Sequence, residues 1–535
     1  MKRLTRSRDL TSTRPGLFAV LLLAGGLSAY GGCGFSPGVT RLSDDPVTPP
    51  PGQETKFLTA KECRDCHPVH YREWRTSMHA FAQHSPAVLE FINFVIRGSG
   101  GTLGSFCTRC HTPIGISAGE SPIRPNAKRS EAANDSVGCI SCHAVGTRDG
   151  QASAEFHVPI PGDPTPTIYG PYYGPDEPGA PPDPALRLID RVKTIHASRR
   201  SDYITEGRFC GSCHDVFLID GTRLEEAFIE WKNSPYARRG IQCQDCHMSP
   251  VPGKPIPRSQ WTKEPIVDED LFRNAPKRYR TNHKFTGPDY ALFPDFGKAD
   301  LRMDDAEFKA WEAQLEEDRK TLFRNAATIT VSHPDEVRPG SRLRVRVAVT
   351  NSGTGHNLPT GFAAERQVWL EVIVRDATGQ QLYASGDLDR FGDLRDHESE
   401  EVRKATLPLD RDLFNAQAKF VVREFRGTDS EAISTTNRLL DPVPYLTPAP
   451  TAASILGFPA TSRIHKHGIP PLATKTATYG LRVPADAQGP LTLSVRLRFR
   501  NFPAHLFRDI GIGELRSRLR VIDMQEYEKK ITLVR

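Results

Sequence analysis

The sequence lacks the features that mark several large classes of protein. Its main apolar run, residues 17–29, is too short to span a bilayer, and a hydrophobic content of 38% excludes a multi-span membrane protein. Net charge is small, because residues 1–33 carry five basic groups and one acid, hence +4 of the formal +6, which leaves +2 for the rest. We therefore expect no polyanion-binding role and no nucleic-acid partner. Repeats and low-complexity segments are also absent.

The first 33 residues have the organisation of an export signal. Basic residues precede the apolar run, and Cys33 follows it closely in "LSAYGGCG". This arrangement resembles a bacterial lipoprotein signal, in which lipid on the cysteine anchors the mature chain. Tyr30 stands where such signals prefer leucine, so ordinary cleavage and a soluble exported form remain open. We expect export to the periplasm, outer membrane or cell surface, a lipid anchor at Cys33, and a flexible linker over 34–56.

Ten of the eleven cysteines form five C-x-x-C pairs, and a histidine follows each pair at once. Residues i and i+3 lie on one side of a helical turn, so two thiols can add to the vinyl groups of one porphyrin while the next imidazole faces the iron. Disulfides and zinc sites also use cysteine pairs but do not require the histidine. The motif is that of covalent haem attachment, and it predicts five haem c groups.

The predicted haem residues belong to "CRDCH" (63–67), "CTRCH" (107–111), "CISCH" (139–143), "CGSCH" (210–214) and "CQDCH" (243–247). The attachment cysteines are Cys63, Cys66, Cys107, Cys110, Cys139, Cys142, Cys210, Cys213, Cys243 and Cys246. The iron ligands of the same motifs are His67, His111, His143, His214 and His247.

The second axial ligand of each iron separates an electron carrier from a catalyst, because an empty position permits substrate binding. After Met1 only Met78, Met248, Met303 and Met524 remain, too few for five haems, so histidine is the expected ligand. The candidates are His79, His196, His283 and His356, with weaker signals for His84, for His157 and for the pair His465 and His467. We expect His70, His333, His397 and His505 at the surface or in hydrogen bonds.

His356 lies in "TGHNLPTG", residues 354–361, beyond the last cysteine. Glycines around it permit backbone turns closed to other residues, and Pro359 stiffens the exit of the loop. A short loop of this kind can project an imidazole at low entropic cost. The alternative is a tight β-turn in which the histidine bonds its own backbone.

The second half of the chain changes from helical to strand periodicity. Residues 304–325 place apolar side chains at helical spacing, and residues 341–351, 367–376 and 491–501 read as strands, two of which alternate clearly between apolar and polar residues. One apolar face per strand implies an antiparallel, immunoglobulin-like β-sandwich. The predicted architecture is a multidomain α+β protein. Its parts are a haem domain of helical and irregular structure over 57–299, a connecting helix over 300–325 and the sandwich over 326–535.

Four segments carry a resemblance to a known family: "CRDCHPVHYREWRTSMHA", "YITEGRFCGSCH", "HKFTG" and "GHNLPTG". They resemble exported multihaem c-type cytochromes related to the tetrahaem electron acceptor of hydroxylamine oxidoreductase. The likeness covers residues 57–290 through its motifs and reaches the β-domain more loosely. It implies that His79 of the "WxxSxH" pattern and His283 of the "HxFxG" pattern bind haems attached elsewhere. This chain has five motifs rather than four and no obvious fifth distal histidine.

These observations predict an electron-transfer protein with five mainly bis-histidine haems in a periplasmic or cell-surface respiratory chain. Its partners would be redox proteins, either other cytochromes or a quinol-linked donor. The alternative is an oxidoreductase of small nitrogen or sulfur compounds at one five-coordinate haem. None of the five motifs carries lysine in place of histidine, as catalytic haems in related nitrite reductases often do, which favours the carrier over the enzyme. An adhesive β-sandwich with incidental haems is the third reading.

Overall fold

The structure is a computed structural model of the chain. It describes residues 57–98, 104–146, 158, 167–183, 187–188, 195–217, 223–424, 432–436 and 462–534, all within one compact unit, Pro46–Arg535. The predicted export signal with Cys33, the linker 34–56 and His157 lie outside the described residues. Among the helices of the described residues, none is long and apolar enough to cross a membrane.

The motif-bearing region consists mainly of short helices and irregular segments, because each haem motif forms a single helical turn and prolines interrupt the chain between the motifs. Four of the described helices begin with proline, where its missing N–H is not needed. The helices are α1 (Ala60–Arg64), α2 (Pro68–Arg75), α3 (Met78–Phe81), α4 (Pro86–Gly98), α5 (Thr108–His111), α6 (Pro113–Ser117), α7 (Glu131–Asn134), α8 (Cys139–His143), α9 (Gly207–Gly211), α10 (Ala227–Lys232), α11 (Pro235–Arg238) and α12 (Cys243–His247).

Three small two-stranded sheets lie among these helices in the part of the chain that the structure describes. β1 (Thr167–Gly170) pairs in parallel with β2 (Ala197–Arg200). The antiparallel pairs are β3 (Val216–Phe217) with β4 (Arg223–Glu225), and β5 (Lys263–Glu264) with β6 (Arg278–Tyr279). Single 3₁₀ turns are η1 (Asn126–Lys128), η5 (Tyr203–Thr205), η6 (Arg258–Gln260) and η7 (Lys298–Asp300).

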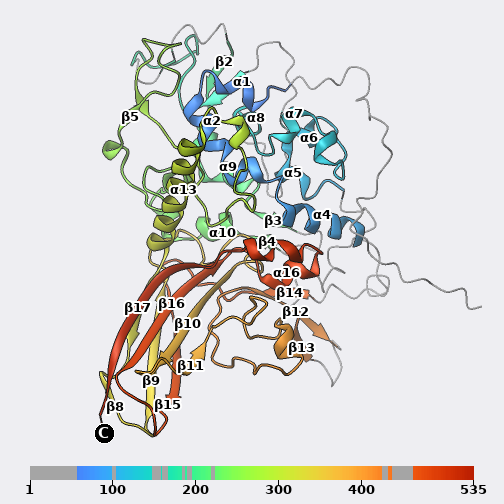
Figure 1. The fold of residues 1–535 in the computed structure, drawn as a ribbon. Coiled ribbons are helices and arrows are strands. Elements are labelled where there is room, and N and C mark those ends of the chain that lie inside the picture. Colours follow the sequence, from blue (N-terminus) through green and yellow to red (C-terminus); the bar gives the residue numbers. More distant parts are fainter. Residues whose placement is uncertain are drawn as a thin grey trace, which may run out of the picture. The chain divides into compact units, whose positions relative to one another are not determined.

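The long helix α13 (Asp305–Ala326) leads from the motif-bearing region to the strands (Figure 1). Its start is fixed by a capping box, in which Asp304 accepts from the N–H of Glu307 and the Glu307 carboxylate accepts from the N–H of Asp304. It contacts the motif-bearing region at its middle and end, because Trp311 donates to Thr76 Oγ1 at 3.0 Å and Asn325 donates to Pro252 O at 2.9 Å. The helix occupies the place predicted from the periodicity of residues 304–325.

The described strands after α13 form three further sheets. The largest has the order β11-β10-β16-β17-β8 and is antiparallel except for the β17–β8 pair, and the other two have the orders β15-β9-β7 and β13-β12-β14. The strands are β7 (Thr328–Ser332), β8 (Glu336–Val337), β9 (Arg342–Thr350), β10 (Gln367–Arg375), β11 (Gln381–Ser385), β12 (Lys419–Glu424), β13 (Ala432–Thr436), β14 (Ser462–His465), β15 (Thr474–Arg482), β16 (Leu491–Arg500) and β17 (Ile522–Leu533).

One apolar core joins the largest sheet to the β15-β9-β7 sheet. β9 and β16 alternate between buried and more exposed residues, as expected of strands with one face against a core. Each buried aliphatic side chain stabilises the fold by about 1.5–3 kcal/mol. The inward residues are Leu343, Val345, Val347 and Val349 of β9 and Leu491, Leu493, Val495, Leu497 and Phe499 of β16.

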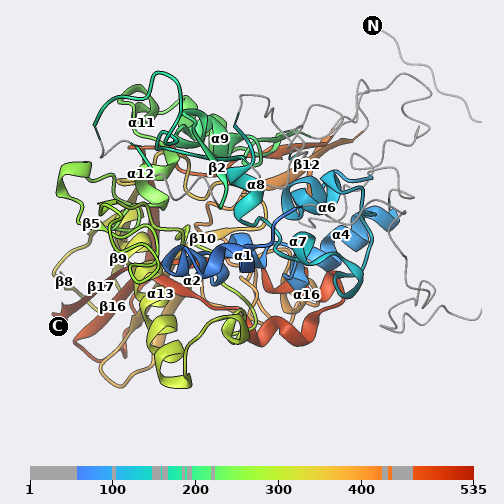
Figure 2. The same cartoon turned by 90° about the horizontal axis from the view of Figure 1, so that it is seen from above.

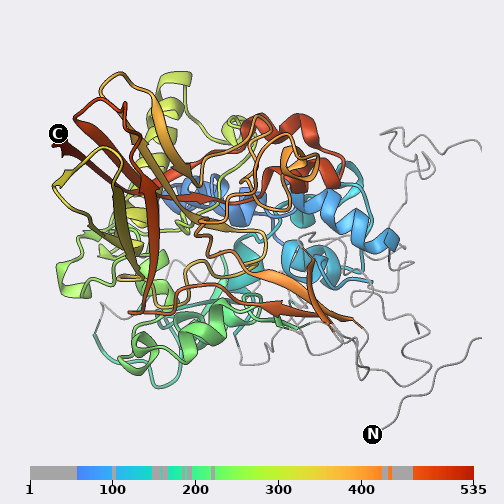
Figure 3. The same cartoon turned by 90° about the horizontal axis from the view of Figure 1, so that it is seen from below.

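A second apolar cluster connects the motif-bearing region to the C-terminal part of the chain. Ala87, with Phe91 and Phe94 packed beside it on α4, shares this cluster with Leu506 and Phe507 of α16 (Ala504–Asp509). α16 lies beside α4 in the views from the side and from above, and the view from below shows the same pair (Figures 1, 2 and 3). Two further helical turns among the described residues are α14 (Glu400–Arg403) and η9 (Gly513–Arg518).

The predicted fold class is confirmed at the coarser level, as a helical and irregular region followed by several β-sheets. The immunoglobulin-like classification and the domain boundaries stay predictions. Arg500, on what the sequence suggested is the polar face of its strand, is only 2% exposed and donates to Gln367 Oε1.

Candidate haem-binding site

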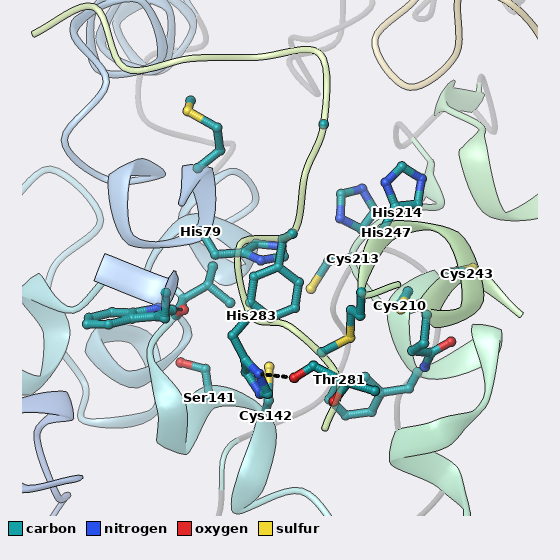
Figure 4. A pocket seen from close by; sticks show the side chains of 18 of the residues that line it. His79, Ser141, Cys142, Cys210, Cys213, His214, Cys243, His247, Thr281 and His283 are labelled. Carbon is teal, nitrogen blue, oxygen red and sulfur yellow. Dashed lines mark hydrogen bonds between the residues drawn. The ribbon is translucent and has the colours of Figure 1, made fainter. Parts of the chain in front are cut away.

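A single cavity of about 1110 Å³ brings the five motifs together. All ten motif cysteines and all five motif histidines line it, and its walls are mostly apolar. Its volume exceeds the roughly 300–1,000 Å³ of an ordinary small-molecule pocket. Figure 4 shows one part of it, where His79, His214, His247 and His283 lie around the same space as Cys142, Cys210 and Cys213.

Each motif adopts the helical turn that two-point attachment requires. In three of them the histidine N–H donates to the carbonyl of the first cysteine: His67 to Cys63 at 2.9 Å, His111 to Cys107 at 3.4 Å, and His214 to Cys210 at 2.9 Å. The other two motifs are the helices α8 and α12 themselves. Both thiols of a pair therefore face one side, and none of the ten cysteines is in a disulfide.

The thiols also show which motifs are neighbours. Cys63 interacts with Cys139, Cys110 with Cys213, and Cys210 with Cys243. Cys213 in addition lies close enough to Cys142 for an electrostatic interaction. The motif at 210–214 is therefore adjacent to three of the other four.

The Nδ1 atoms of the motif histidines all have a hydrogen-bond acceptor. For four of them it is a backbone carbonyl, whereas the fifth, His214, bonds the carboxylate of Glu225 at 2.7 Å. An Nδ1–H bond fixes the ring orientation and leaves Nε2 for a metal. The four carbonyl bonds are His67 to Ile266 at 2.7 Å, His111 to Ala82 at 3.0 Å, His143 to Tyr169 at 2.7 Å and His247 to Thr286 at 2.9 Å.

Three motif histidines face a second histidine at the same separation. The ring centres of His214 and His79, His143 and His283, and His247 and His356 are each 6.3 Å apart. An imidazole nitrogen binds a transition metal at about 2 Å and lies ~1.1 Å from its ring centre, so two rings on opposite sides of one iron are about 6 Å apart. The separations and the donor set therefore fit haem iron with two histidine ligands.

Burial keeps these second histidines in the neutral form that binds metals. It lowers the pKa of His79 to about 3, of His283 to about 3 and of His356 to about 4. His283 Nδ1 bonds the carbonyl of Thr281 at 3.2 Å (Figure 4). His356 Nδ1 bonds the carbonyl of Asn357 at 2.9 Å. Both rings are thereby oriented with Nε2 available.

His214 differs from these histidines. Burial opposes its positive charge, but the charge and hydrogen bond of Glu225 outweigh burial and raise the pKa of His214 to about 9. Glu225 was not singled out by its sequence context. It ends β4, whose pairing with β3 places it beside His214, two residues before the start of β3.

Of the two other candidate ligands, His196 lies in the cavity and His84 does not. His196 lines the cavity and interacts electrostatically with His67 and His143, of which His143 already faces His283. His84 is not brought to the other ligands, because its Nε2 bonds the carbonyl of Asn134 at 2.8 Å and its ring packs against Phe296. Among the histidines that the structure describes, none forms a ring pair with His111.

His70 corrects an expectation from the sequence, which placed it at the surface or in a hydrogen bond. It lies in the cavity, with its ring centre 5.8 Å from that of His67 and 4.8 Å from that of His283. Burial holds its pKa well below the usual range. The available signal was its spacing, because position i+3 from His67 on α2 lies on the same face as the motif histidine.

Asn351 holds the His356 loop from the side of the sheets. Its side chain is fully buried and donates to the carbonyls of His356 and Ile469, each at 2.9 Å, while its Oδ1 accepts from the Thr354 hydroxyl at 2.7 Å. Gly353 is required next to it, because a Cβ there would lie 1.8 Å from Asn325 O. The loop begins from a fixed point at the end of β9.

Glu230 of α10 holds the same loop from the motif-bearing region. It accepts from the N–H of Asn357 at 3.1 Å, from the Asn357 side chain at 2.7 Å and from the Thr360 hydroxyl. Burial raises the pKa of this carboxyl to about 7, and the donors oppose that rise by favouring the charged form. His356 therefore reaches the cavity in a loop anchored at both ends.

We expect Glu230→Gln to loosen this anchor, since hydrogen bonds to a charged group contribute about 1.5–3 kcal/mol each. Part of one haem signal should change from low to high spin in the oxidised holoprotein spectrum. Lys232→Gln, at an exposed position of the same helix, is the matched control and should leave the spectrum unchanged. Identical spectra for both variants would mean that the loop does not depend on Glu230.

Residues 62–144 match the family model described as cytochrome c554 and c-prime. The structure also resembles that of a penta-haem cytochrome c552 from Thermochromatium tepidum, with a TM-score of 0.51 and 17% sequence identity, covering 89% of this chain and 100% of that chain. At this identity the likeness shows the fold alone. Comparison with curated proteins gives no match. The family match and the shared fold support a multihaem c-type cytochrome with covalently bound haem, as the motifs predicted.

Proposed function

We propose that this protein carries electrons through five covalently bound haems in an exported respiratory chain. The observation that carries the proposal is the set of three histidine pairs, each 6.3 Å apart, in the cavity that all ten motif cysteines line. A bound haem supplies one reversible one-electron centre. The chain's own residues would hold each porphyrin at two thiols, orient the motif imidazole through its Nδ1 bond, and surround the centres with apolar walls that limit reorganisation.

In this proposal four motif histidines share an iron with a second histidine. The pairs are His143 with His283, His214 with His79, and His247 with His356, and His196 serves opposite His67. His196 is assigned by its interaction with His67 and by the engagement of His143 elsewhere. The contacts between motif cysteines supply the neighbour relations that a continuous electron path needs.

Haem stoichiometry tests this proposal. The intact mass of the exported protein should exceed that of its processed polypeptide by five covalently attached haems. A mass corresponding to four or fewer would contradict the assignment of all five motifs.

A second candidate function follows from His111. Its Nδ1 is bonded to Ala82, which leaves Nε2 for iron, yet no second histidine faces it among the described residues. A haem bound there would have one open axial position, so we propose it as the place where a small nitrogen or sulfur compound would bind. Nitrite or hydroxylamine added to the oxidised protein should then shift the high-spin bands, and an unchanged spectrum would leave electron transfer as the sole function.

We further propose the location and partners predicted from the sequence. These are a lipid anchor at Cys33, placement in the periplasm, at the outer membrane or at the cell surface, and exchange of electrons with other cytochromes or a quinol-linked donor. The export signal in residues 1–33 supports the first two. Cys33→Ser should release the holoprotein from the membrane fraction. Retention of that variant in the membrane would exclude this anchor.

A further inference from the structure

One of the five motif histidines differs from the others in the group that accepts its Nδ1–H. His214 donates to the carboxylate of Glu225 at 2.7 Å, whereas the other four donate to neutral backbone carbonyls. A hydrogen bond to an ionised acceptor is about twice as strong as one between neutral groups. The ring of His214 is therefore in a different electrostatic environment.

The structure around Glu225 preserves this bond. The Glu225 side chain is only 12% exposed and lines the cavity beside the His214 ring. Arg366 is close enough to interact electrostatically with Glu225, but its own hydrogen bond goes to Asp289 at 2.6 Å. The β3–β4 hairpin pairs Glu225 with Val216, two residues after His214, and this pairing fixes the carboxylate beside the ring.

A carboxylate on Nδ1 makes an imidazole a stronger electron donor, because it draws the ring proton and raises the electron density on Nε2. A stronger donor stabilises ferric iron more than ferrous iron, which lowers the reduction potential. Since the other four rings have neutral partners, this effect acts at one motif only.

That motif occupies a central place among the five. Cys213 interacts with Cys110 and lies near Cys142, and Cys210 interacts with Cys243, so the motif at 210–214 neighbours three others. Electrons that move between these neighbours have this motif on their route. If the haem at this motif has a low reduction potential, electrons would pass through it but would mostly reduce the haems at the neighbouring motifs.

We propose that Glu225 is a positioning residue that lowers the reduction potential of the central haem through His214. The proposal rests on the proposed function, because it requires His214 to bind iron. The Glu225 carboxylate acts on the ligand alone, and it is expected neither to hold the haem nor to contact a redox partner.

The test is a spectroelectrochemical titration of the full-length holoprotein carrying Glu225→Gln. One of the one-electron transitions should move to higher potential, while the others, the haem mass and the low-spin spectrum stay as in the wild type. The control is Glu226→Gln, which removes the adjacent buried carboxylate, one that pairs with Lys466 instead of a motif histidine. This control variant should leave every one-electron transition at its wild-type potential.

A Glu225→Gln titration that superimposes on the wild type, with five haems and an unchanged spectrum, would overturn the inference. If that variant incorporates fewer haems, Glu225→Asp replaces it, because aspartate keeps the charge but lengthens the hydrogen bond. A smaller shift in the same direction supports the proposal, and no shift contradicts it. His214→Ala separates the two proposals, since a low-spin spectrum unchanged in that variant would contradict the proposed function itself.

Discussion

Replacing His356 by alanine should convert one haem of the oxidised holoprotein from low spin to high spin and raise its reduction potential. The ring of His356 stacks 6.3 Å from that of His247 with an interplanar angle of 15°. In the proposed assignment it is the ligand that the loop after β9 supplies to the motif at 243–247. Loss of one imidazole leaves an open axial position, and loss of its donation favours ferrous iron. Optical and EPR spectra with a redox titration measure both effects.

His333→Ala is the matched control for this variant. His333 also belongs to the strand-rich half of the chain, but its Nε2 bonds the hydroxyl of Tyr527 at 2.8 Å, and it does not line the cavity. Its replacement should leave spectra and potentials as they are. If the spectra and potentials of His356→Ala match those of His333→Ala, the loop has only a structural role and does not supply a ligand.

Asn351→Ala should both destabilise the fold and disturb the same haem. The substitution removes donors from the carbonyls of His356 and Ile469 and an acceptor from Thr354, all in a fully buried position. Both carbonyls keep another donor, because the Thr354 hydroxyl bonds His356 O and the Leu358 N–H bonds Ile469 O. The cost is therefore that of the four lost hydrogen bonds, at about 0.5–1.5 kcal/mol each, or about 2–6 kcal/mol in total. The denaturation midpoint of the holoprotein should fall, and a high-spin fraction should appear.

Ser352→Ala tests whether the effect belongs to this side chain. Ser352 is the next residue and is exposed. Its replacement should change the free energy of unfolding by less than about 0.5 kcal/mol. A stable Asn351→Ala variant with a wild-type spectrum would show that the His356 loop is held by Glu230 and the sheet alone.

The sequence predicted which residues are candidate iron ligands better than it predicted which two histidines face each other. The motif cysteines and histidines could be named from spacing, because two-point attachment is local chemistry on one helical turn. His283 and His356 could be named as second ligands, but the motif histidine that each faces could not. His143 and His283 are far apart in the chain, and their pairing depends on packing among irregular segments.

Residues that act on the ligands were harder to predict. Glu225 and Glu230 lie in "RLEEAFIEWK", where several acids follow one another and none differs in pattern from a solvated helix face. Only the β3–β4 pairing and the contact of α10 with the His356 loop distinguish them. His70 was misplaced for a related reason, because the apolar cavity that accepts its ring is formed by distant segments.

The strands were predictable because their periodicity matches a buried face. β9 and β16 bury the residues that alternation selected. Arg500 was misread because the alternation continued to the strand end, where a loop carrying Gly392 covers it. A sequence alternation with a period of two residues shows which side chains share a face of the strand. It does not show which other segments of the chain cover that face.

The spin states of the oxidised holoprotein test the central claim most directly. The proposed ligand assignment gives four motif histidines a second histidine and finds none for His111 among the described residues. About four fifths of the iron should therefore be low spin and one fifth high spin, counted by EPR against total haem. A sample with five haems in which most of the iron is high spin would contradict the histidine pairs on which this account depends.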